Sequence, residues 1–194
     1  MSNFAPAFLK ALAVSLGVSQ KGAHGLPQGL TPEDIFHYAY TVFHSPGYRS
    51  RYAEFLKIDF PRLPLTGNLE LFRALARLGS ELISLHLMES PKLDHHLTTY
   101  VGPANPEVER VSYSRDTVWL DKAQTRGFRG VPEAVWNFHI GGYQVCEKWL
   151  KDRRGLALSL DDRVHFARIV ASIRETLRLV ERMDDLVPYW PPRI

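Results

Sequence analysis

Hydrophobic residues recur at helical spacing in several stretches of the chain, and these stretches predict a largely helical protein. Phe8, Leu12 and Leu16 would form one apolar face of a short N-terminal helix that Gly17 ends. Between residues 68 and 88, apolar side chains again return every three or four positions, which is typical of a core helix. The stripe of a long last helix consists of Val164, Ala167, Val170, Ile173, Leu177 and Val180.

Polar residues mark the expected starts of three helices. Thr31 stands directly before Pro32 and two acidic residues, which together form a complete helix-start signal. Ser45 precedes another proline and restarts the pattern, with Tyr48, Tyr52, Phe55 and Leu56 on one side of the helix wheel. Ser159 followed by Asp162 is a variant of the capping box and predicts the start of the last helix.

Glycine and proline separate these helices. Residues 17–31 hold four glycines and a proline among polar residues, so we expect a linker or extended loop there. The prolines of "KIDFPRLPLTGN" forbid a helix and predict an extended segment. Gly79, inside the expected core helix, predicts a close approach of a second helix.

The pattern changes in the middle of the chain. Val111 and Tyr113 alternate with polar residues, "SRDT" can turn, and "VWL" follows, which predicts a β-hairpin. Pro132 would start a short helix in "GVPEAVWNF", and Gly155 would close another in "YQVCEKWLKDRRG". The fold expected is α+β and mostly helical, with a small antiparallel sheet. We expect an N-terminal helix and linker over 1–30, the main domain over 31–187 and a tail over 188–194.

Composition adds little to this picture. The formal net charge of +3 is mild, so only local clustering could indicate an anionic partner. The single cysteine, Cys146, excludes an internal disulfide, fits a reducing compartment and is expected to be a small core residue. Lys10 interrupts the apolar N-terminal stretch, which is also too short to span a bilayer. We therefore expect a cytoplasmic protein without a signal, an anchor or a membrane partner.

The residues offer no convincing catalytic constellation. Asp94, His95 and His96 lie together, but adjacent histidines seldom point at one ion, and no helical H-x-x-x-H spacing or cysteine pair supports a zinc site. The sequence contains neither G-x-S-x-G nor G-x-x-x-x-G-K-[ST]. We expect no metal and no catalytic residues, and a hydrolase that uses this Asp-His-His group has the least support.

Two segments concentrate positive charge. In "FHIGGYQVCEKWLKDRRG", residues 138–155, four basic residues face two acidic ones, and two glycines precede the expected helix. These glycines could begin a phosphate cradle, but a tight strand-to-helix turn explains Gly141 and Gly142 better. Residues 110–130 hold five basic against two acidic residues, interleaved with three aromatic ones. This mixture is typical of a nucleic-acid surface as well as of a solvated face.

Long strings of the chain resemble one known family. They are "GLTPEDIFHYAYTVFHSPGYRSRYAEFLKIDFPRLPLT", "LFRALARLGSELISLHLM" and the stretch from "FRGVPEAVWNFHIGGYQVCEKWLKDRRG" to "IRETLRLV". Together these strings resemble the C-terminal specificity domain of type ISP restriction-modification enzymes, colinearly from about Phe4 to Asp185. The segment "LDKAQTRGFRG" is more basic and less regular than the family pattern.

The resemblance implies a function. In those enzymes a nuclease, a helicase-type DNA translocase and an adenine-N6 methyltransferase precede this domain, which reads a short asymmetric DNA sequence and presents the adenine. The chain lacks the N-P-P-[YF]-like tetrapeptide and the Gly-rich loop that a methyltransferase using S-adenosylmethionine would need. We therefore expect an excised fragment or a separately encoded module that has no cofactor and is not an enzyme on its own.

The partners expected are double-stranded DNA and the methyltransferase domain of the parent enzyme. Charge and loop placement, rather than the resemblance, select the contact residues. The residues proposed to contact phosphates are Lys148, Lys151, Arg153, Arg126 and Arg129. The candidate base readers are Arg115, Lys122 and Gln124. The alternative is a helical interaction module that docks on the methyltransferase domain through the N-terminal stretch and the stripe of Tyr48, Tyr52 and Phe55, with little DNA contact.

Overall fold

The computed structural model describes residues 3–95 and 98–192, and the chain forms two compact units. Unit 1 comprises Met1–Ser84 and Arg178–Ile194, and unit 2 comprises Leu85–Leu177. The boundaries expected after residues 30 and 187 both lie inside unit 1. Helices predominate and the strands are antiparallel, which confirms the α+β, mostly helical fold.

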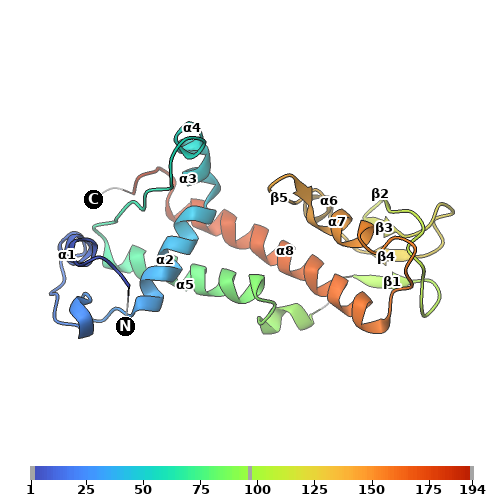
Figure 1. Cartoon of the computed structure of the whole chain (residues 1–194), viewed down its shortest axis with the longest axis horizontal. Coiled ribbons are helices and arrows are strands. Elements are labelled where there is room, and N and C mark those ends of the chain that lie inside the picture. Colours follow the sequence, from blue (N-terminus) through green and yellow to red (C-terminus); the bar gives the residue numbers. More distant parts are fainter. Residues whose placement is uncertain (1–2, 96–97, 193–194) are drawn as a thin grey trace. The chain divides into compact units, whose positions relative to one another are not determined.

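Unit 1 is helical (Figure 1). Its elements are α1 (Pro6–Ser15), η1 (Ala23–Gly25), α2 (Pro32–His44), α3 (Pro46–Arg51), α4 (Ala53–Leu56), most of α5 (Leu69–His86) and the last turns of α8 (Leu160–Leu186).

The helix ends of unit 1 follow the sequence signals. Gly17 has φ 63°, and the N–H groups of Gly17 and Val18 donate to the last carbonyls of α1, as in a Schellman motif. The Thr31 hydroxyl accepts from the Asp34 N–H, and the Asp34 carboxylate accepts from the Thr31 N–H. Ser45 caps α3 in a similar way. The predicted ends and starts are confirmed.

One core cluster holds unit 1 together. Leu9 and Leu12 of α1, and Leu16 at the end of this helix, are buried against side chains of α2 and α5. The N-terminal helix therefore belongs to this core. Gly79 confirms the predicted close approach, because a Cβ there would clash with the His37 carbonyl oxygen and the Thr41 hydroxyl of α2. The Thr41 hydroxyl donates to the Leu75 carbonyl at 2.7 Å across the same contact.

The aromatic stripe after Ser45 departs from one expectation. Tyr52 has φ −108° and ψ 18°, so the chain forms two short helices, α3 and α4, where the wheel treats the segment as one. Tyr48 is buried and its hydroxyl donates to the Arg62 carbonyl at 2.7 Å. The extended segment that carries Arg62 is confirmed and folds back on this tyrosine.

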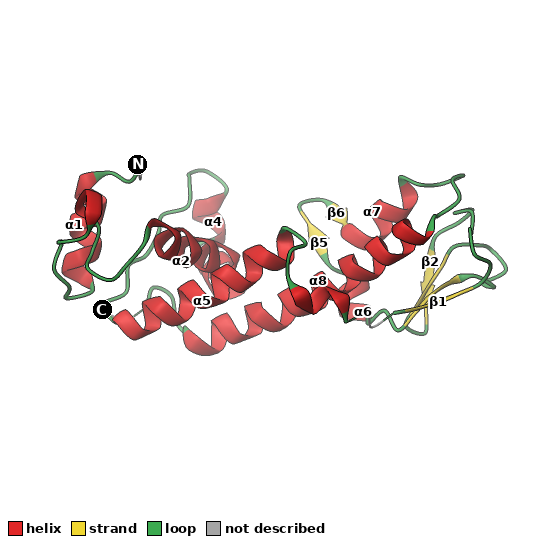
Figure 2. Cartoon of the chain, turned by 90° about the horizontal axis from the view of Figure 1, so that it is seen from below, coloured by secondary structure: helices red, strands yellow, loops and turns green. Residues whose placement is uncertain are grey.

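Unit 2 combines the small sheet with helices (Figure 2). Its elements after α5 are η2 (Pro91–Asp94), β1 (Thr99–Val101), β2 (Ser112–Ser114), β3 (Thr117–Trp119), β4 (Gly127–Arg129), α6 (Glu133–Trp136), β5 (His139–Ile140), β6 (Tyr143–Gln144), α7 (Val145–Lys151) and α8 up to Leu177.

The four-stranded sheet has the order β1-β4-β3-β2, and each neighbouring pair is antiparallel. Tyr113, Val118, Phe128 and Tyr100 lie opposite one another along one row, and this row faces the core of unit 2. The Phe128 ring lies 4.4 Å from the Phe166 ring of α8, which fixes the sheet to that helix. The predicted hairpin is confirmed as β2 and β3, whereas the sequence did not predict β1 and β4.

Three further details of unit 2 concern the predictions. Gly155 does not close α7, which ends at Lys151. The Gly155 N–H instead donates to the Val108 carbonyl at 2.8 Å, and the glycine has φ 78°. Ser159 and Asp162 form the predicted capping box of α8. Val164 is exposed, so the buried stripe of this helix does not include it.

Cys146 is fully buried, which confirms it as a core residue. Burial raises the pKa of its thiol to about 12, so the reactive thiolate is suppressed.

Candidate nucleic-acid interface

The turn between β2 and β3 presents Arg115. Arg115 and Asp116 both have φ 52°, as in a type I′ turn, where glycine and asparagine are the usual residues. The Asp116 carbonyl accepts from the N–H groups of Gly130 and Val131, and its carboxylate accepts from the Tyr113 hydroxyl at 3.0 Å. The turn is therefore anchored through Asp116, and the Arg115 side chain is exposed.

Tyr113 holds this turn in place through a hydrogen bond and a ring contact. Its hydroxyl lies 2.9 Å from the Val131 carbonyl and its ring stacks on Trp136, with ring centroids 5.3 Å apart. Burial, together with the hydrogen bond to Asp116, raises the pKa of Tyr113 to about 12, so the hydroxyl stays a donor.

The loop between β3 and β4 presents Lys122 and Gln124. Asp121 is buried at its base, and its carboxylate accepts from the Thr125 N–H and hydroxyl and from the Arg126 N–H. Burial alone would raise the pKa of Asp121, but these hydrogen bonds together lower it below its ordinary value. Gln124 has φ 56° and is exposed, as is Lys122.

The outer face of the sheet is polar. Because side chains alternate between faces, Ser112, Ser114, Thr117 and Trp119 point away from the Val118 row. The Trp119 Nε1–H donates to the Ser114 hydroxyl at 3.0 Å on this face. Arg129 lies opposite Thr117 in the register, so its exposed guanidinium stands on the same face.

The candidate residues of the sheet gather at its two ends. Arg129 pairs with Thr117, next to the turn that carries Arg115. The other end holds the Lys122–Gln124 loop and Arg126. Arg126 lies 3.5 Å from Glu109 and is mostly buried, and its Nε has no hydrogen-bond partner in the described part of the chain.

The cations of helix α7 lie in a different environment. Lys148 forms an ion pair with Asp152, and Lys151 forms one with Glu147 at 2.9 Å. Both pairs span one helical turn, the spacing that stabilises a helix surface. These two lysines are exposed, but each already has an anionic partner in its own helix.

Arg153 is built into the surface of unit 2. Its guanidinium lies 3.6 Å from the centre of the Trp149 ring, donates to the Trp149 carbonyl at 3.1 Å and lies 3.5 Å from the Asp162 carboxylate. Hydrogen bonds from the Ser159 side chain and backbone lower the pKa of Asp162, and Arg153 adds to this effect. A ring contact, a hydrogen bond and an ion pair thus hold Arg153 within unit 2.

Gly141 and Gly142 connect β5 to β6. Gly141 has φ 59°, which favours glycine, and neither glycine has an atom near the position of a Cβ. Helix α7 begins only after β6, so the predicted strand-to-helix turn is wrong: the glycines form a turn, but between two strands. Ile140 and Tyr143 on these strands are each 63% exposed.

Basic side chains without a partner distinguish the sheet from helix α7. In the described part of unit 2, five Lys and Arg side chains form no hydrogen bond, ion pair or ring contact; they are Arg110, Arg115, Lys122, Arg129 and Arg174. Four of these five lie in residues 110–130. Arg110 was not among the predicted site residues, although it belongs to the same basic segment.

Other chemistry finds no support in the described residues. No three His, Cys, Asp or Glu side chains in residues 3–95 and 98–192 are grouped to hold a metal ion. Asp94 lies 3.9 Å from Arg168, and His96 lies outside the described residues. No helix in the described ranges is long and apolar enough to cross a bilayer.

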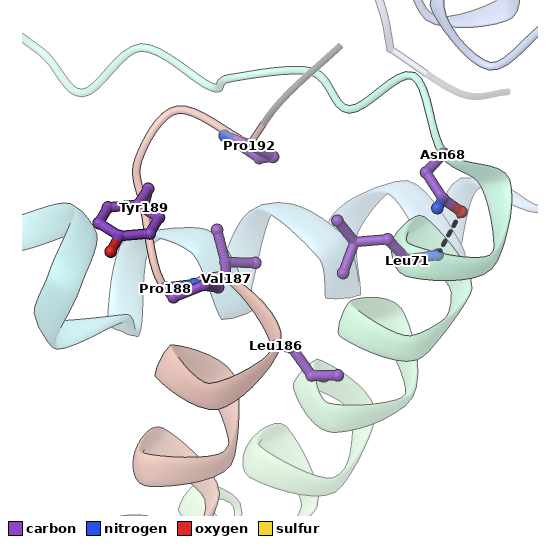
Figure 3. A pocket seen from close by; sticks show the side chains of 7 residues that line it. All are labelled: Asn68, Leu71, Leu186, Val187, Pro188, Tyr189 and Pro192. Carbon is purple, nitrogen blue, oxygen red and sulfur yellow. Dashed lines mark hydrogen bonds between the residues drawn. The ribbon is translucent and has the colours of Figure 1, made fainter.

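Unit 1 has an apolar hollow of about 410 Å³ near its C-terminal segment. Figure 3 shows Leu71, Leu186, Val187 and Tyr189 around it, with Asn68 at one side. The Asn68 Oδ1 accepts from the Leu71 N–H at 3.0 Å, so this amide caps α5. The hollow offers apolar contact and little polar chemistry.

Known proteins resemble the chain over most of its length. The family model for the Type ISP C-terminal specificity domain matches residues 1–182. No curated protein matches significantly.

Three solved structures share the fold. The nuclease-deletion mutant of the Type ISP restriction-modification enzyme LlaGI, in complex with a DNA substrate mimic, is 22% identical with a TM-score of 0.59. The ATP-dependent Type ISP enzyme LlaBIII bound to DNA is 18% identical with a TM-score of 0.60, and the DrdV-DNA complex is 24% identical with a TM-score of 0.66. These matches cover 79%, 80% and 93% of the chain, but only 14%, 11% and 20% of the respective solved chains.

Proposed function

The chain belongs to the family of Type ISP C-terminal specificity domains, and from this premise we propose that it recognises a specific sequence of duplex DNA. In this proposal it acts within a longer restriction-modification enzyme and positions the target adenine for a methyltransferase domain. The three solved relatives are described as DNA complexes, which supports duplex DNA as the partner.

One observation carries the assignment of the DNA surface to the sheet of unit 2. Arg115 and Gln124 both have φ above 50°, a conformation that costs an L-residue roughly 1 kcal/mol relative to glycine. Both side chains are exposed, so packing gives no reason to prefer them to glycine. At the two loops of the sheet, these side chains are therefore free to contact a partner.

These positions suit base reading. Arginine and glutamine carry the paired hydrogen-bonding groups that recognise guanine and adenine edges in the major groove. Lys122 stands beside Gln124 on the loop that Asp121 anchors. We assign Arg115, Lys122 and Gln124 to base contacts and Arg129 to phosphates, whereas Arg126 can contact a phosphate only if it leaves Glu109 or shares it.

Helix α7 has a smaller part in this proposal. Lys148 and Lys151 can contact phosphates only if they leave Asp152 and Glu147 or share them. Arg153 would have to leave Trp149 and Asp162. A nearby carboxylate balances each of these three cations, so we expect them to add little to the binding energy and the sheet to supply the direct contacts.

Catalysis is assigned to the absent part of the parent enzyme. S-adenosylmethionine would bind in the methyltransferase domain, and this chain would have no activity alone. The family match to a specificity domain supports this division.

The test uses three glycine variants of the full chain. Arg115→Gly and Gln124→Gly remove a proposed base contact and relieve a positive φ, whereas His24→Gly relieves the same strain at an exposed site in unit 1. Binding to duplexes of defined sequence is measured by fluorescence anisotropy across a salt series, and stability by denaturant unfolding. We expect all three variants to unfold within about 1 kcal/mol of wild type.

Only the two sheet variants should lose discrimination between duplexes, by about 1–3 kcal/mol at the base concerned. The His24 variant should bind as wild type does. Absence of duplex binding by the wild-type chain at low salt would overturn the proposal. Unchanged discrimination in both sheet variants would overturn the residue assignment.

A docking function is the second candidate. Ile58 and Phe60 in unit 1 are each 85% exposed, and Tyr52 and Phe55 line a nearby hollow of about 320 Å³. Apolar exposure of this kind is typical of an interface with another domain. The double variant Ile58→Ser, Phe60→Ser should abolish binding of a separately purified methyltransferase domain if this function holds, while DNA binding by the chain is unaffected.

A further inference from the structure

A polar hollow of about 390 Å³ lies in unit 1 and shares no residue with the sheet surface assigned above. Helices α2 and α5 and the turn at Gly29 form it. The side chains around its rim belong to Asp34, His37, Arg73, Arg77 and Ser80, and its apolar lining comes from Leu30, Phe72 and Ala76.

The rim carries hydrogen-bond donors that the fold does not use. Arg77, His37 and Ser80 form no side-chain hydrogen bond or ion pair with any described residue. Arg73 lies 3.2 Å from Glu70, but this exposed pair leaves other guanidinium N–H groups available. Arg73 and Arg77 are one turn apart on α5, where like charges destabilise a helix.

The acidic residue of the rim is already occupied. The Asp34 Oδ2 accepts from the Thr31 N–H at 2.8 Å and from the Thr31 hydroxyl at 3.0 Å. This carboxylate therefore serves the start of α2 and forms no ion pair with Arg73 or Arg77 in the structure. The negative charge of Asp34 reduces the attraction of the hollow for an anion, but it does not pair with either arginine.

The floor of the hollow strengthens electrostatic contacts. Phe72 is fully buried beneath it, and Leu30 and Ala76 are nearly so. Charges above an apolar floor attract an anion more strongly than charges in open solvent, because the effective dielectric is lower. Gly29 has φ 78° and leaves the edge beside Arg73 without a side chain.

We propose that this hollow binds a phosphate-type oxyanion through Arg77, Arg73, His37 and Ser80. Two arginines, an imidazole and a hydroxyl match the acceptor oxygens of a phosphoryl group. The phosphate belongs either to the DNA backbone, in which case the site extends the proposed function to unit 1, or to a small phosphoryl compound. The experiment has one arm for each source.

The variants are Arg77→Ala and His37→Ala in the full chain, with Arg51→Ala as the matched control. Arg51 is exposed in the same unit, has no ion pair with a described residue and does not line the hollow. The first arm measures duplex binding across a salt series. The second measures the unfolding temperature with inorganic phosphate, pyrophosphate or ATP, against chloride at equal ionic strength.

If the hollow binds a phosphate of the DNA backbone, Arg77→Ala should weaken duplex binding about three- to tenfold at low salt and reduce the salt slope by about 0.9, while Arg51→Ala should change neither.

If the hollow binds a small phosphoryl compound, one of the three anions should raise the unfolding temperature of wild type and of Arg51→Ala. It should not raise that of Arg77→Ala or His37→Ala.

The proposal is overturned if Arg77→Ala and His37→Ala match Arg51→Ala in both arms. This result is distinguishable from failure of the proposed function. A chain that binds no duplex, but is stabilised by phosphate through Arg77, keeps the oxyanion site and loses the DNA function. A chain whose DNA binding responds only to the Arg115 and Gln124 variants, and whose unfolding temperature responds to none of the three anions through Arg77, keeps the function and loses this site.

Discussion

Two basic segments of unit 2 have similar charge and different surroundings. Residues 138–155 carry four basic and two acidic side chains, and residues 110–130 carry five and two. In the first segment both lysines of α7 have ion-pair partners, and Arg153 is stacked on Trp149. In the second, four cations have no partner in the described part of the chain.

For the binding of an anion, the number of cations without a partner therefore matters more than the net charge of a segment. A lysine that neutralises a neighbouring carboxylate gains less from a phosphate, because the carboxylate is then left near the new anion. The α7 pairs follow from the spacing of Glu147 to Lys151 and of Lys148 to Asp152, which is four residues in each case. The sheet segment lacks such spacing between opposite charges.

The largest expected effect compares two double variants. Arg115→Ala with Lys122→Ala should weaken binding to the recognised duplex about 100-fold and reduce discrimination between duplexes, because two base contacts are lost. Lys148→Ala with Lys151→Ala should weaken it no more than a few-fold. Anisotropy titrations of all four lysine and arginine single variants complete the comparison, and an equal loss in the two double variants would remove the distinction.

The next largest effect is expected at Asp121, the buried carboxylate that anchors the loop between β3 and β4. Asp121→Ala removes the acceptor of three hydrogen-bond donors and should lower the free energy of unfolding by about 2–3 kcal/mol. Loop disorder should also weaken DNA binding through Lys122 and Gln124. Asp152→Ala, on the exposed surface of α7, is the matched control and should cost less than about 1 kcal/mol in urea unfolding.

Acid provides a second test of this anchor. Since the folded-state pKa of Asp121 lies below its ordinary value of 3.8, its stabilisation is complete above that pH and is lost as the pH falls through the folded-state pKa. Asp121→Asn should therefore flatten the pH dependence of stability below pH 3.8. A variant whose acid unfolding follows that of wild type would show that Asp121 contributes nothing through ionisation.

Much of the helical framework could be predicted, because its signals are local. Thr31 with Asp34, Ser159 with Asp162, and Gly17 each mark a helix end through hydrogen bonds within a few residues. The hairpin of β2 and β3 was also predictable from alternation. These signals do not depend on the rest of the fold.

Long-range pairing could not be predicted from the sequence. Strands β1 and β4 have three residues each, and 25 residues separate the end of one from the start of the other. The three residues of β4 show no alternation of their own, and the partner strand supplies the hydrogen bonds. The left-handed conformation of Gln124 was hidden for the same reason, since it depends on the buried Asp121.

A smaller effect is expected at Arg153. Arg153→Ala removes the guanidinium from the Trp149 ring and from Asp162, and should cost about 1–2 kcal/mol of stability. Arg153→Lys keeps the charge but loses the planar stack, and should recover only part of this loss. DNA affinity should remain within a few-fold of wild type in both, as measured by anisotropy. A large loss of affinity in stable variants would instead assign Arg153 to the DNA surface.

The smallest expected effect is a gain of DNA affinity instead of a loss. Glu147→Gln with Asp152→Asn removes the partners of Lys151 and Lys148 and leaves both lysines free. If ion pairing is what keeps α7 from binding DNA, duplex affinity at low salt should rise about threefold and the salt dependence should become steeper. Stability should fall by less than about 1 kcal/mol, because two surface pairs are lost while a negative charge leaves the C-terminal end of α7. Unchanged affinity would show that α7 faces away from the bound duplex, so that position rather than pairing separates it from the sheet.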